Sequence, residues 1–402
     1  MEAVAAELNL DPAEVRRRYF IPKASLPAAT ASGLVYDSGD YELTLNKALE
    51  QIDYPKRRAE QAEAAKEGRY IGIGIASYVE ICGIGPSARL PPELKGGGSE
   101  SCTVRIEPDA NHLLTGVAPH GQGQETSFAQ IVADELGIDI DDVTVVHGDT
   151  AVVPYGIGTF GSRGTTVGGP ALMMSIGKLQ AKMKRIAATM MKVPPDQLEF
   201  RNRTIAMASD ASRSIPQQAV IEATYGYKAV IDGVVPGLDA TSFYEPSACT
   251  FPFGTHVAVV EVDAQTGQVK FLRYVAVDDC GKIISPLLVE GQLHGGIAQG
   301  IAQALYEEVK YDEGGQLLSA TLMDYAVPKA NMLPHFELLS TVTPSPVNSL
   351  GVKGVGEAGT IGSTPCAYNA VLDALKPFGI DELDMPLKPE TVWRAIRDAK
   401  KA

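Results

Sequence analysis

The feature that most restricts how this chain can fold is a glycine-rich stretch around a single carboxylate, residues 351–362. Five of its twelve residues are glycine, and Glu357 is its only acid. Glycine lets the backbone adopt positive φ and approach a bulky group closely. A carboxylate held there, followed by an apolar helix expected over residues 367–375, is a candidate general base facing a bound cofactor. Taken alone, the stretch favours a surface turn with one solvated acid.

A second glycine-rich segment joins a predicted strand to a predicted helix. Residues 113–117 have strand character, His120-Gly121-Gln122-Gly123-Gln124 follows, and residues 126–136 have helical periodicity. Such a junction presents free backbone N–H groups and the positive end of a helix dipole, which suits an anion or the amide edge of a heterocycle. Gln122 adds a donor and an acceptor. By itself the signal is weak, because most junctions of this kind only reverse the chain.

A third segment, residues 156–170, lies between a strand expected over 143–147 and a long helix over 171–191. Its hydroxyl groups, its single arginine and the helix N-terminus could together bind a diphosphate. The alternative is helix capping with a surface arginine. Three such segments in one chain are hard to explain as turns alone. The side chains concerned are Thr159, Ser162, Arg163, Thr165 and Thr166.

Strand and helix patterns alternate along the chain without a βαβ repeat, which predicts the α+β class. With 402 residues, 45% of them hydrophobic, the chain is long enough for two packed lobes. We expect residues 1–250 to form one lobe and residues 251–402 the other, with a loop or linker before Phe253. The apolar helix expected over 286–305 contains four glycines, which predicts close packing because each disfavours a helix by about 1 kcal/mol. Gln299 on that helix could reach a cofactor or be exposed.

Composition argues against several kinds of partner and site. The net charge of −14 disfavours nucleic acid and anionic membranes. The five cysteines are far apart and contain no CxxC pair, so neither a zinc site nor an iron–sulfur cluster is expected. No basic leader and no apolar run of membrane-spanning length is found in the sequence. These features predict a cytoplasmic protein with reduced thiols and no transmembrane segment.

Taken together, four segments resemble, in order and spacing, the molybdopterin-binding region of the xanthine oxidase family of molybdenum hydroxylases. The resemblance covers essentially the whole chain and is strongest to the large subunits of bacterial enzymes like aerobic carbon monoxide dehydrogenase and aldehyde oxidase. It implies a two-lobed cofactor-binding fold and molybdopterin cytosine dinucleotide as the cofactor. The segments are His120-Gly121-Gln122-Gly123-Gln124-Glu125, Gly158-Thr159-Phe160-Gly161-Ser162-Arg163, Gly295-Gly296-Ile297-Ala298-Gln299-Gly300 and Lys353-Gly354-Val355-Gly356-Glu357.

The same resemblance assigns roles to individual residues. It implies that Glu357 is the base that takes a proton from a hydroxyl group on molybdenum, that Gln122 lies beside the metal and the pterin, and that Gln299 contacts the pterin. The segment from Gly158 to Thr166 would hold the diphosphate. No side chain is expected to ligate the metal. The expected cofactor contacts are Gln122, Gly121, Gly123, Thr159, Gly161, Ser162, Arg163, Thr165, Gln299, Lys353 and Gly356. A solvated Lys353 is the simpler alternative for that side chain.

Subunits of this family also carry an N-terminal portion that this sequence lacks, including a smaller α/β domain. We therefore expect a separate chain to supply that portion, together with an iron–sulfur subunit and an FAD subunit. The implied reaction is oxidation of an aldehyde, carbon monoxide or a heteroaromatic carbon with water as the oxygen source. The alternatives are a non-catalytic subunit scaffold and, less well supported, a phosphate-binding enzyme that uses residues 158–169 without a P-loop lysine pattern.

Overall fold

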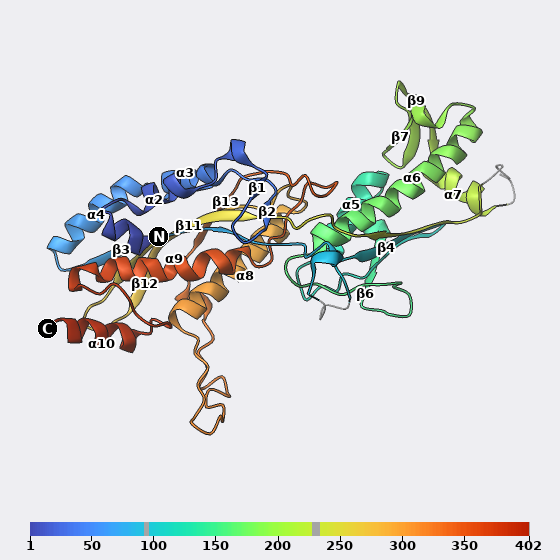
Figure 1. The fold of residues 1–402 in the computed structure, drawn as a ribbon. Coiled ribbons are helices and arrows are strands. Elements are labelled where there is room, and N and C mark those ends of the chain that lie inside the picture. The colour runs from blue at the N-terminus through green and yellow to red at the C-terminus, as the bar shows by residue number, and fades with distance from the viewer. Residues whose placement is uncertain (92–95, 227–233, 402) are drawn as a thin grey trace.

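The structure is a computed structural model that describes residues 1–91, 96–226 and 234–401. The chain forms two lobes (Figure 1). The terminal lobe contains both chain ends and a four-stranded sheet in the order β13-β12-β11-β3. β3 (Tyr70–Val79) and β12 (Val269–Asp279) pair antiparallel with β11 (Phe253–Val262), whereas β13 (Phe336–Ser340) runs parallel to β12. β11 and β12 are consecutive strands and form a hairpin.

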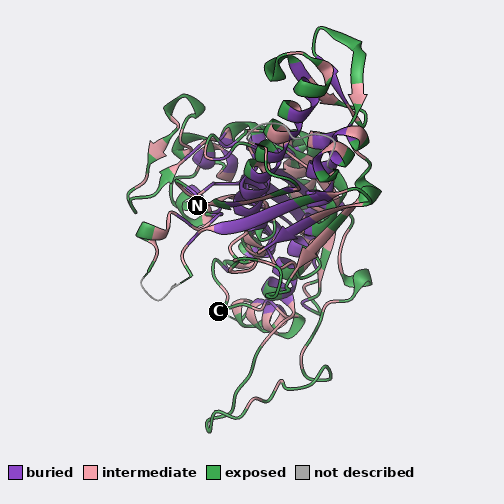
Figure 2. Ribbon diagram, turned by 90° about the vertical axis from the view of Figure 1, so that its right-hand side faces the viewer, coloured by how far each residue is buried: buried purple, intermediate pink, exposed green. Residues whose placement is uncertain are grey.

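Helices cover both faces of this sheet, so β11 is buried along almost its whole length (Figure 2). Strands enclosed on both sides show continuous rather than alternating apolar character. On one face, Leu45 and Ile52 pack against Val257 and Val275. That face carries α2 (Pro12–Tyr19), α3 (Tyr41–Ile52) and α4 (Tyr54–Lys66), and the other carries α8 (Pro286–Leu305), α9 (Ala358–Leu375) and α10 (Pro389–Ala399).

Glycines allow α9 to cross β3 and α8 at very short range. A Cβ on Gly74 would lie 2.1 Å from the Cys366 carbonyl oxygen, and one on Gly359 would lie 2.7 Å from the Ile297 nitrogen. Gly300 likewise faces α9, where its Cβ would lie 1.9 Å from Ser363 Oγ. The close packing predicted from the glycines of α8 is therefore found at Gly296 and Gly300. At Gly291 and Gly295 an added Cβ meets open space.

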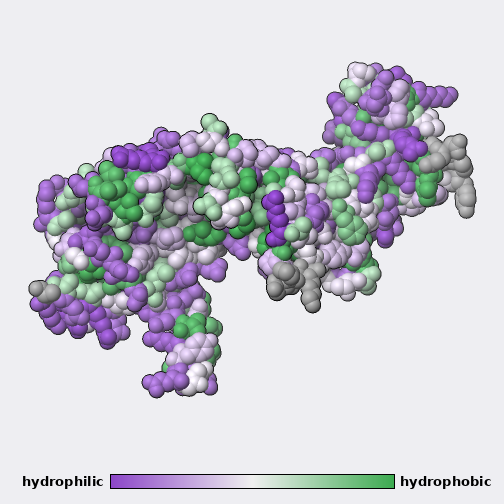
Figure 3. Space-filling view, viewed as in Figure 1, coloured by the Kyte–Doolittle hydropathy of each residue, from purple (hydrophilic) through white to green (hydrophobic). Residues whose placement is uncertain are grey.

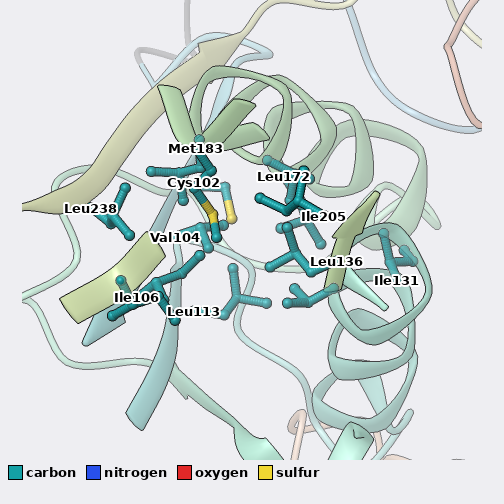
Figure 4. Close-up of a cluster of buried hydrophobic side chains, with 14 of the residues drawn as sticks. Cys102, Val104, Ile106, Leu113, Ile131, Leu136, Leu172, Met183, Ile205 and Leu238 are labelled. Atoms are coloured by element: carbon teal, nitrogen blue, oxygen red, sulfur yellow. The ribbon is translucent and has the colours of Figure 1, made fainter. Parts of the chain in front are cut away.

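The middle lobe is built on a second four-stranded sheet in the order β10-β4-β5-β6. Its core lies between this sheet and two helices, where Cys102, Val104 and Leu113 face Leu136 and Leu172 (Figure 4). Its elements are β4 (Glu100–Glu107), β5 (Ala110–Thr115), α5 (Gln124–Leu136), β6 (Val143–His147), α6 (Gly169–Met191) and β10 (Leu238–Tyr244), with a small sheet of β7 (Leu198–Arg201), β8 (Thr204–Met207) and β9 (Asp210–Pro216) beside α7 (Gln217–Tyr225).

The mixed helix and sheet architecture confirms the predicted α+β class, but the grouping of residues into lobes differs from the prediction. β3 lies at the edge of the sheet that contains β11, so residues 1–79 pack with residues after 250 rather than with the middle lobe. The stretch expected to be a loop before Phe253 contains α7 and β10, and its residues 227–233 lie outside the described part. β10 pairs with β4, which lies more than 130 residues earlier in the sequence, and no local pattern reveals such a pairing.

A long segment between α8 and β13 projects from the terminal lobe (Figures 1 and 3). This segment contains an isolated antiparallel bridge between Tyr311 and Leu317. Leu322 and Met323 on this segment are 81% and 93% exposed. None of the described helices is both long and apolar enough to cross a membrane. The remaining elements are α1 (Glu2–Glu7), β1 (Ala28–Ala29) and β2 (Val35–Tyr36), besides short 3-10 turns.

Candidate cofactor site

The three glycine-rich segments meet at one cavity of about 300 Å³ where the two lobes join. We call it the central cavity. A fourth group of lining residues was not predicted as part of the site. It lies just before α8 and in the first turns of that helix, and it includes Lys282 and Gln292. The lining residues are His120, Gln122, Gln124 and Ser127, the residues 159–162, 164 and 165, the residues 280, 282–285, 288, 289 and 292, and the residues 352–357.

Four helical N-termini open onto the central cavity. α5 begins at Gln124, a π-helical turn (Gly164–Gly168) leads into α6, α8 begins at Pro286 and α9 at Ala358. No side chain caps the first turn of any of the four. Uncapped first turns leave N–H donors at the positive end of the helix dipole. The arrangement favours an anionic ligand such as a diphosphate.

Two buried polar atoms at the cavity wall have no hydrogen-bond partner among the residues that the structure describes. They are Thr159 Oγ1 and Gln124 Oε1. Leaving such an atom buried and unsatisfied costs about 1–3 kcal/mol. A polar ligand in the central cavity would remove that cost, and these atoms are therefore a positive sign of a binding site.

Gln122 lies on the turn between β5 and α5, with glycines on both sides. Gly121 and Gly123 have φ of 102° and 76°, a region that glycine adopts without strain and that reverses the chain here. The Gln122 side chain folds back on this turn, where its Oε1 accepts from the His120 backbone and its Nε2 lies 2.9 Å from His120 Nδ1. The cavity lining includes Gln122, while the two glycines shape the turn behind it.

Glu357 lies at the rim of the central cavity as the residue immediately before α9. The helix predicted from residue 367 begins at Ala358, because Gly359 and Gly362 pack against α8 and His256 despite the poor helix propensity of glycine. Glu357 is exposed, and its Oε2 lies 2.7 Å from Ser162 Oγ. A Cβ on the neighbouring Gly356 would lie 3.4 Å from the same hydroxyl oxygen. The glycine-rich segments at residues 351–362 and 156–170 are thus in direct contact through this hydrogen bond.

A second acid, Glu80, lies behind Ser162 and was not identified from the sequence. Its Oε1 is 3.1 Å from Ser162 Oγ and accepts a hydrogen bond from the Cys82 thiol at 3.0 Å. Burial raises the pKa of Glu80 from 4.5 to about 7, and the nearby Glu357 charge adds to the rise. The only local signal was an acid placed directly after the apolar strand of residues 70–79.

Arg163 has a different environment from the one expected of a diphosphate ligand. Its side chain is fully buried, and it donates to Glu100 Oε2 at 2.7 Å and to the carbonyl oxygens of Gly98, Ser99 and Gly158. It is absent from the residues that line the central cavity. Burial raises the pKa of Glu100, and the Arg163 guanidinium opposes that rise. Within the described residues, Arg163 holds the loop in place rather than facing the cavity.

The other predicted residues divide into two groups. Thr159, Gly161, Ser162 and Thr165 line the central cavity, as do Lys353 and Gly356. Lys353 is not solvated: its side chain is buried, donates to the Ser38 carbonyl oxygen at 3.1 Å and lies over the Phe253 ring, and burial lowers its pKa. The structure does not bring Gln299 to the cavity. That side chain is exposed two turns further along α8 than Gln292 and accepts from Thr360 at 3.4 Å.

Protein ligands for a metal were not expected, and the described ranges 1–91, 96–226 and 234–401 contain no group of three or more His, Cys, Asp or Glu side chains that could hold one. The donors around the central cavity are instead backbone N–H groups, hydroxyls and amides. Such donors suit a large polar organic cofactor that brings its own metal.

Comparison with known proteins identifies the family. Residues 47–334 match the family described as "Molybdopterin cofactor-binding domain". The chain belongs to this family. The resemblance inferred from the four segments is thereby confirmed. Three of the four segments, at residues 120–125, 158–163 and 295–300, fall within the matched range. The segment that carries Glu357 follows it.

The similar proteins are named as large chains or large subunits of enzymes. The chain is 40% identical to the carbon monoxide dehydrogenase large chain of Hydrogenophaga pseudoflava, over 99% of this chain and 50% of that protein. It is 33% identical to the nicotine 6-hydroxylase large subunit of Paenarthrobacter nicotinovorans, over 99% and 49%. This chain therefore spans about half the length of the curated relatives it matches.

Solved structures give the same result for the fold. A Cu,Mo-CO dehydrogenase superimposes with a TM-score of 0.94 at 37% identity, over 99% of this chain and 51% of that one. Quinoline 2-oxidoreductase from Pseudomonas putida 86 superimposes with a TM-score of 0.92 at 34% identity, over 99% and 51%. The two-lobed arrangement of this molybdopterin-binding chain is therefore that of half a large subunit.

The residues of the central cavity fit a molybdenum cofactor. Four uncapped helical N-termini can hold anionic groups, and Gly161 and Gly356 keep the wall free of side chains. Thr159 Oγ1 and Gln124 Oε1 lack partners within the described ranges. Thr165 and Ser127 offer further hydroxyls at the same wall. Together these groups match the needs of a ligand that combines a diphosphate with a polar heterocycle.

Proposed function

We propose that this chain is the cofactor-binding half of the large subunit of a molybdenum hydroxylase, which oxidises carbon monoxide, an aldehyde or a heteroaromatic carbon with water as the oxygen donor. The observation that carries the proposal is the meeting of three distant glycine-rich segments at one cavity, with uncapped helices and a carboxylate at its rim. Relatives named for carbon monoxide and for nicotine, and a structural neighbour named for quinoline, support this range of substrates.

The proposed cofactor is molybdopterin cytosine dinucleotide, and the proposed electron acceptors are an iron–sulfur subunit and an FAD subunit. When bound, the cofactor supplies the redox-active metal at which substrate carbon is oxidised. In this proposal the N-termini of α5 and α6, with Thr159 and Thr165, hold its diphosphate. Gln122 and Gln124 donate and accept along its polar edge. The helix dipoles and N–H groups are fixed before the ligand arrives, so little reorganisation opposes binding.

Glu357 is proposed as the general base of the reaction. Its carboxylate lies at the cavity rim, where it would accept a proton, and its Oε2 is in hydrogen-bond contact with the Ser162 hydroxyl. That hydrogen bond fixes the rotamer of the carboxylate, which a positioned base requires. The remaining wall of the substrate site, and with it the choice among substrates, is proposed to come from the half of the large subunit that this chain does not span.

The first test measures molybdenum and cytosine nucleotide in the purified enzyme after growth with molybdate. Both should be present in amounts close to one per large subunit. If neither is found, the cofactor assignment fails.

The second test replaces Glu357 by glutamine, which keeps the shape of the side chain and removes its basicity. The variant should retain the cofactor and lose about 10²–10⁴-fold in kcat, the usual contribution of a general base. Glu290→Gln is the matched control, because Glu290 is an exposed acid on α8 that does not line the cavity. A Glu357→Gln enzyme with near-normal kcat would remove Glu357 from this role.

A non-catalytic scaffold is not favoured. A scaffold would gain nothing from buried polar atoms without partners at Thr159 and Gln124, and selection for stability alone would replace them. The molybdenum measurement separates the two, since a scaffold would be isolated without metal.

A further inference from the structure

The Ser162 hydroxyl lies between two carboxylates. Its Oγ is 2.7 Å from Glu357 Oε2 and 3.1 Å from Glu80 Oε1. A hydroxyl group has one proton, so it can donate to only one of the two acids at a time. The second short contact is stable only when the other acid donates a proton to Ser162 Oγ. The three groups therefore share protons along a continuous line from the cavity into the protein.

The backbone holds these groups in position. The Glu80 N–H donates to the Pro252 carbonyl oxygen at 2.9 Å, and Cys82 exchanges two backbone hydrogen bonds with Thr250 at 2.9 Å. Ser162 has a φ of 48°, and the neighbouring Gly83 N–H donates to the Gly161 carbonyl oxygen at 3.2 Å. The segment that carries Ser162 is thus tied directly to the segment that carries Glu80.

Packing from the Glu357 segment closes the arrangement. A Cβ on Gly354 would lie 2.4 Å from Ser162 Cβ and 2.6 Å from Cys82 Sγ, so only glycine lets these three segments approach. The contact between Ser162 and the two acids is therefore a result of tertiary packing and not of a flexible side chain that happens to lie nearby.

Glu80 is suited to exchange a proton near neutral pH. It is 5% exposed, and its Oε2 has no hydrogen-bond partner in the described part of the chain. Of the described residues, the groups that act most on its charge are the Cys82 thiol, the Glu357 carboxylate and the Ser162 hydroxyl, none of which is a cation. Tyr78 on β3 also senses the Glu80 charge, but its hydroxyl donates to Asp278. Burial and the neighbouring acid place the pKa of Glu80 at about 7.

We propose that Glu80, Ser162 and Glu357 form a proton relay, in which buried Glu80 receives, through the Ser162 hydroxyl, the proton that Glu357 accepts during turnover. The step begins with the Glu357 proton on Oε2, the oxygen that contacts Ser162, and with the Ser162 O–H directed at Glu80. The proton on Glu357 Oε2 moves to Ser162 Oγ as the Ser162 O–H proton moves to Glu80 Oε1. One proton is transferred, Ser162 ends as a hydroxyl, and Glu357 is a carboxylate again. Reversal of the same steps returns the proton to the cavity and to solvent. The relay rests on the proposed role of Glu357, whereas the shared proton does not.

The first experiment follows the protonation of Glu80 without turnover. The infrared band of protonated carboxyl groups is recorded in the purified enzyme as a function of pH, and the Glu80→Gln spectrum is subtracted. A band with a midpoint near 7 is expected in the wild type. Glu357→Gln should move this midpoint to lower pH, because the Glu357 charge helps to raise the pKa of Glu80. A midpoint that does not respond to Glu357→Gln would overturn the relay.

The second experiment removes the middle group. Ser162→Gly is chosen because the φ of 48° suits glycine, and Ser162→Ala is the second variant if the glycine variant is unstable. Each should keep its molybdenum and lose about 10²-fold in kcat, the lower end of the range for acid–base catalysis. The solvent isotope effect should change from a curved dependence on deuterium fraction, which reports several protons in motion, to a linear one. Full kcat with unchanged curvature would overturn the relay.

The two proposals fail in different ways. If the enzyme contains no molybdenum, the proposed function fails while the infrared coupling of Glu80 to Glu357 is still observed. If the cofactor is present and Glu357→Gln is inactive, but Glu80→Gln and Ser162→Gly have wild-type kcat and pH profile, the proposed function stands and the relay is wrong.

Discussion

The buried pair of Arg163 and Glu100 offers the sharpest test of how the middle lobe holds its cofactor loop. Both side chains are fully buried, and their charged atoms are 2.7 Å apart. Arg163→Met keeps most of the aliphatic volume but leaves the Glu100 carboxylate buried without a counter-charge, with the backbone N–H groups of Ser101, at 3.0 Å, and Ile157 as donors. It also removes the donors to three carbonyl oxygens.

The expected loss is large. Removing one partner of a buried ion pair costs about 3–5 kcal/mol, and the three abandoned carbonyl groups place this case toward the upper end. At 1.4 kcal/mol per tenfold change, a loss of about 4 kcal/mol lowers the folded fraction relative to the unfolded about 10³-fold. Glu100→Leu combined with Arg163→Met removes both charges, so the double variant should be more stable than the sum of the single losses by about 2 kcal/mol or more.

The assay is urea unfolding of the purified protein, followed by circular dichroism, for the two single variants and the double variant. Arg105→Met is the control, because Arg105 and Asp239 form a similar pair at 2.8 Å with both side chains 46% exposed. An exposed pair contributes only about 0.2–1 kcal/mol. The reasoning would be refuted if Arg163→Met and Glu100→Leu each lowered the unfolding free energy by less than about 1 kcal/mol and the two losses were additive in the double variant. If Arg163 instead contacts the diphosphate, Arg163→Met should leave stability unchanged and release the cofactor.

Three further predictions follow from burial and close packing. Burial raises the pKa of Glu80 from 4.5 to about 7, so the folded state binds this proton more tightly than the unfolded chain does. The unfolding free energy relative to Glu80→Gln should therefore fall by about 3 kcal/mol as the pH rises from 4.5 through 7, and then stay level. Urea unfolding across this pH range measures the difference. Gly74→Ala should lower the thermal midpoint because its Cβ would lie 2.1 Å from a backbone oxygen of α9, whereas Gly177→Ala, in open space on α6, should raise stability by about 0.5–1 kcal/mol. Thr159→Val should leave stability equal or slightly higher, because it removes a buried hydroxyl without a partner, while lowering the amount of cofactor retained on dialysis; unchanged retention would contradict the assignment of Thr159 to the site.

Local patterns predicted most of the regular elements, since strand and helix periodicity depend on neighbouring residues. The strand at Val143–His147 and the helix at Pro286–Leu305 have the bounds that periodicity predicts. The elements missed were those whose sequence disagrees with their environment. β10 lies in a stretch rich in turn residues but completes a sheet edge, and the first turns of α9 contain glycines that packing against α8 makes favourable.

The site divides in the same way. The three glycine-rich segments and Glu357 could be identified from the sequence, because the conformational freedom of glycine and the chemistry of a carboxylate belong to the residues themselves. Their meeting at one cavity depends on contacts between residues 195 and 82 positions apart, such as those of Ser162 with Glu357 and Glu80. Composition and spacing carry no information on such distances.

By itself, then, the sequence determined which segments could approach a cofactor and which residue types were available for acid–base chemistry. Only the tertiary structure decided their environments. It buried Arg163 against Glu100 instead of leaving it at the cavity, enclosed Lys353, and placed Glu80 behind Ser162. The physical reason is that burial and the distance to other charges set how a polar group behaves, and both are properties of the packed chain rather than of any segment in it.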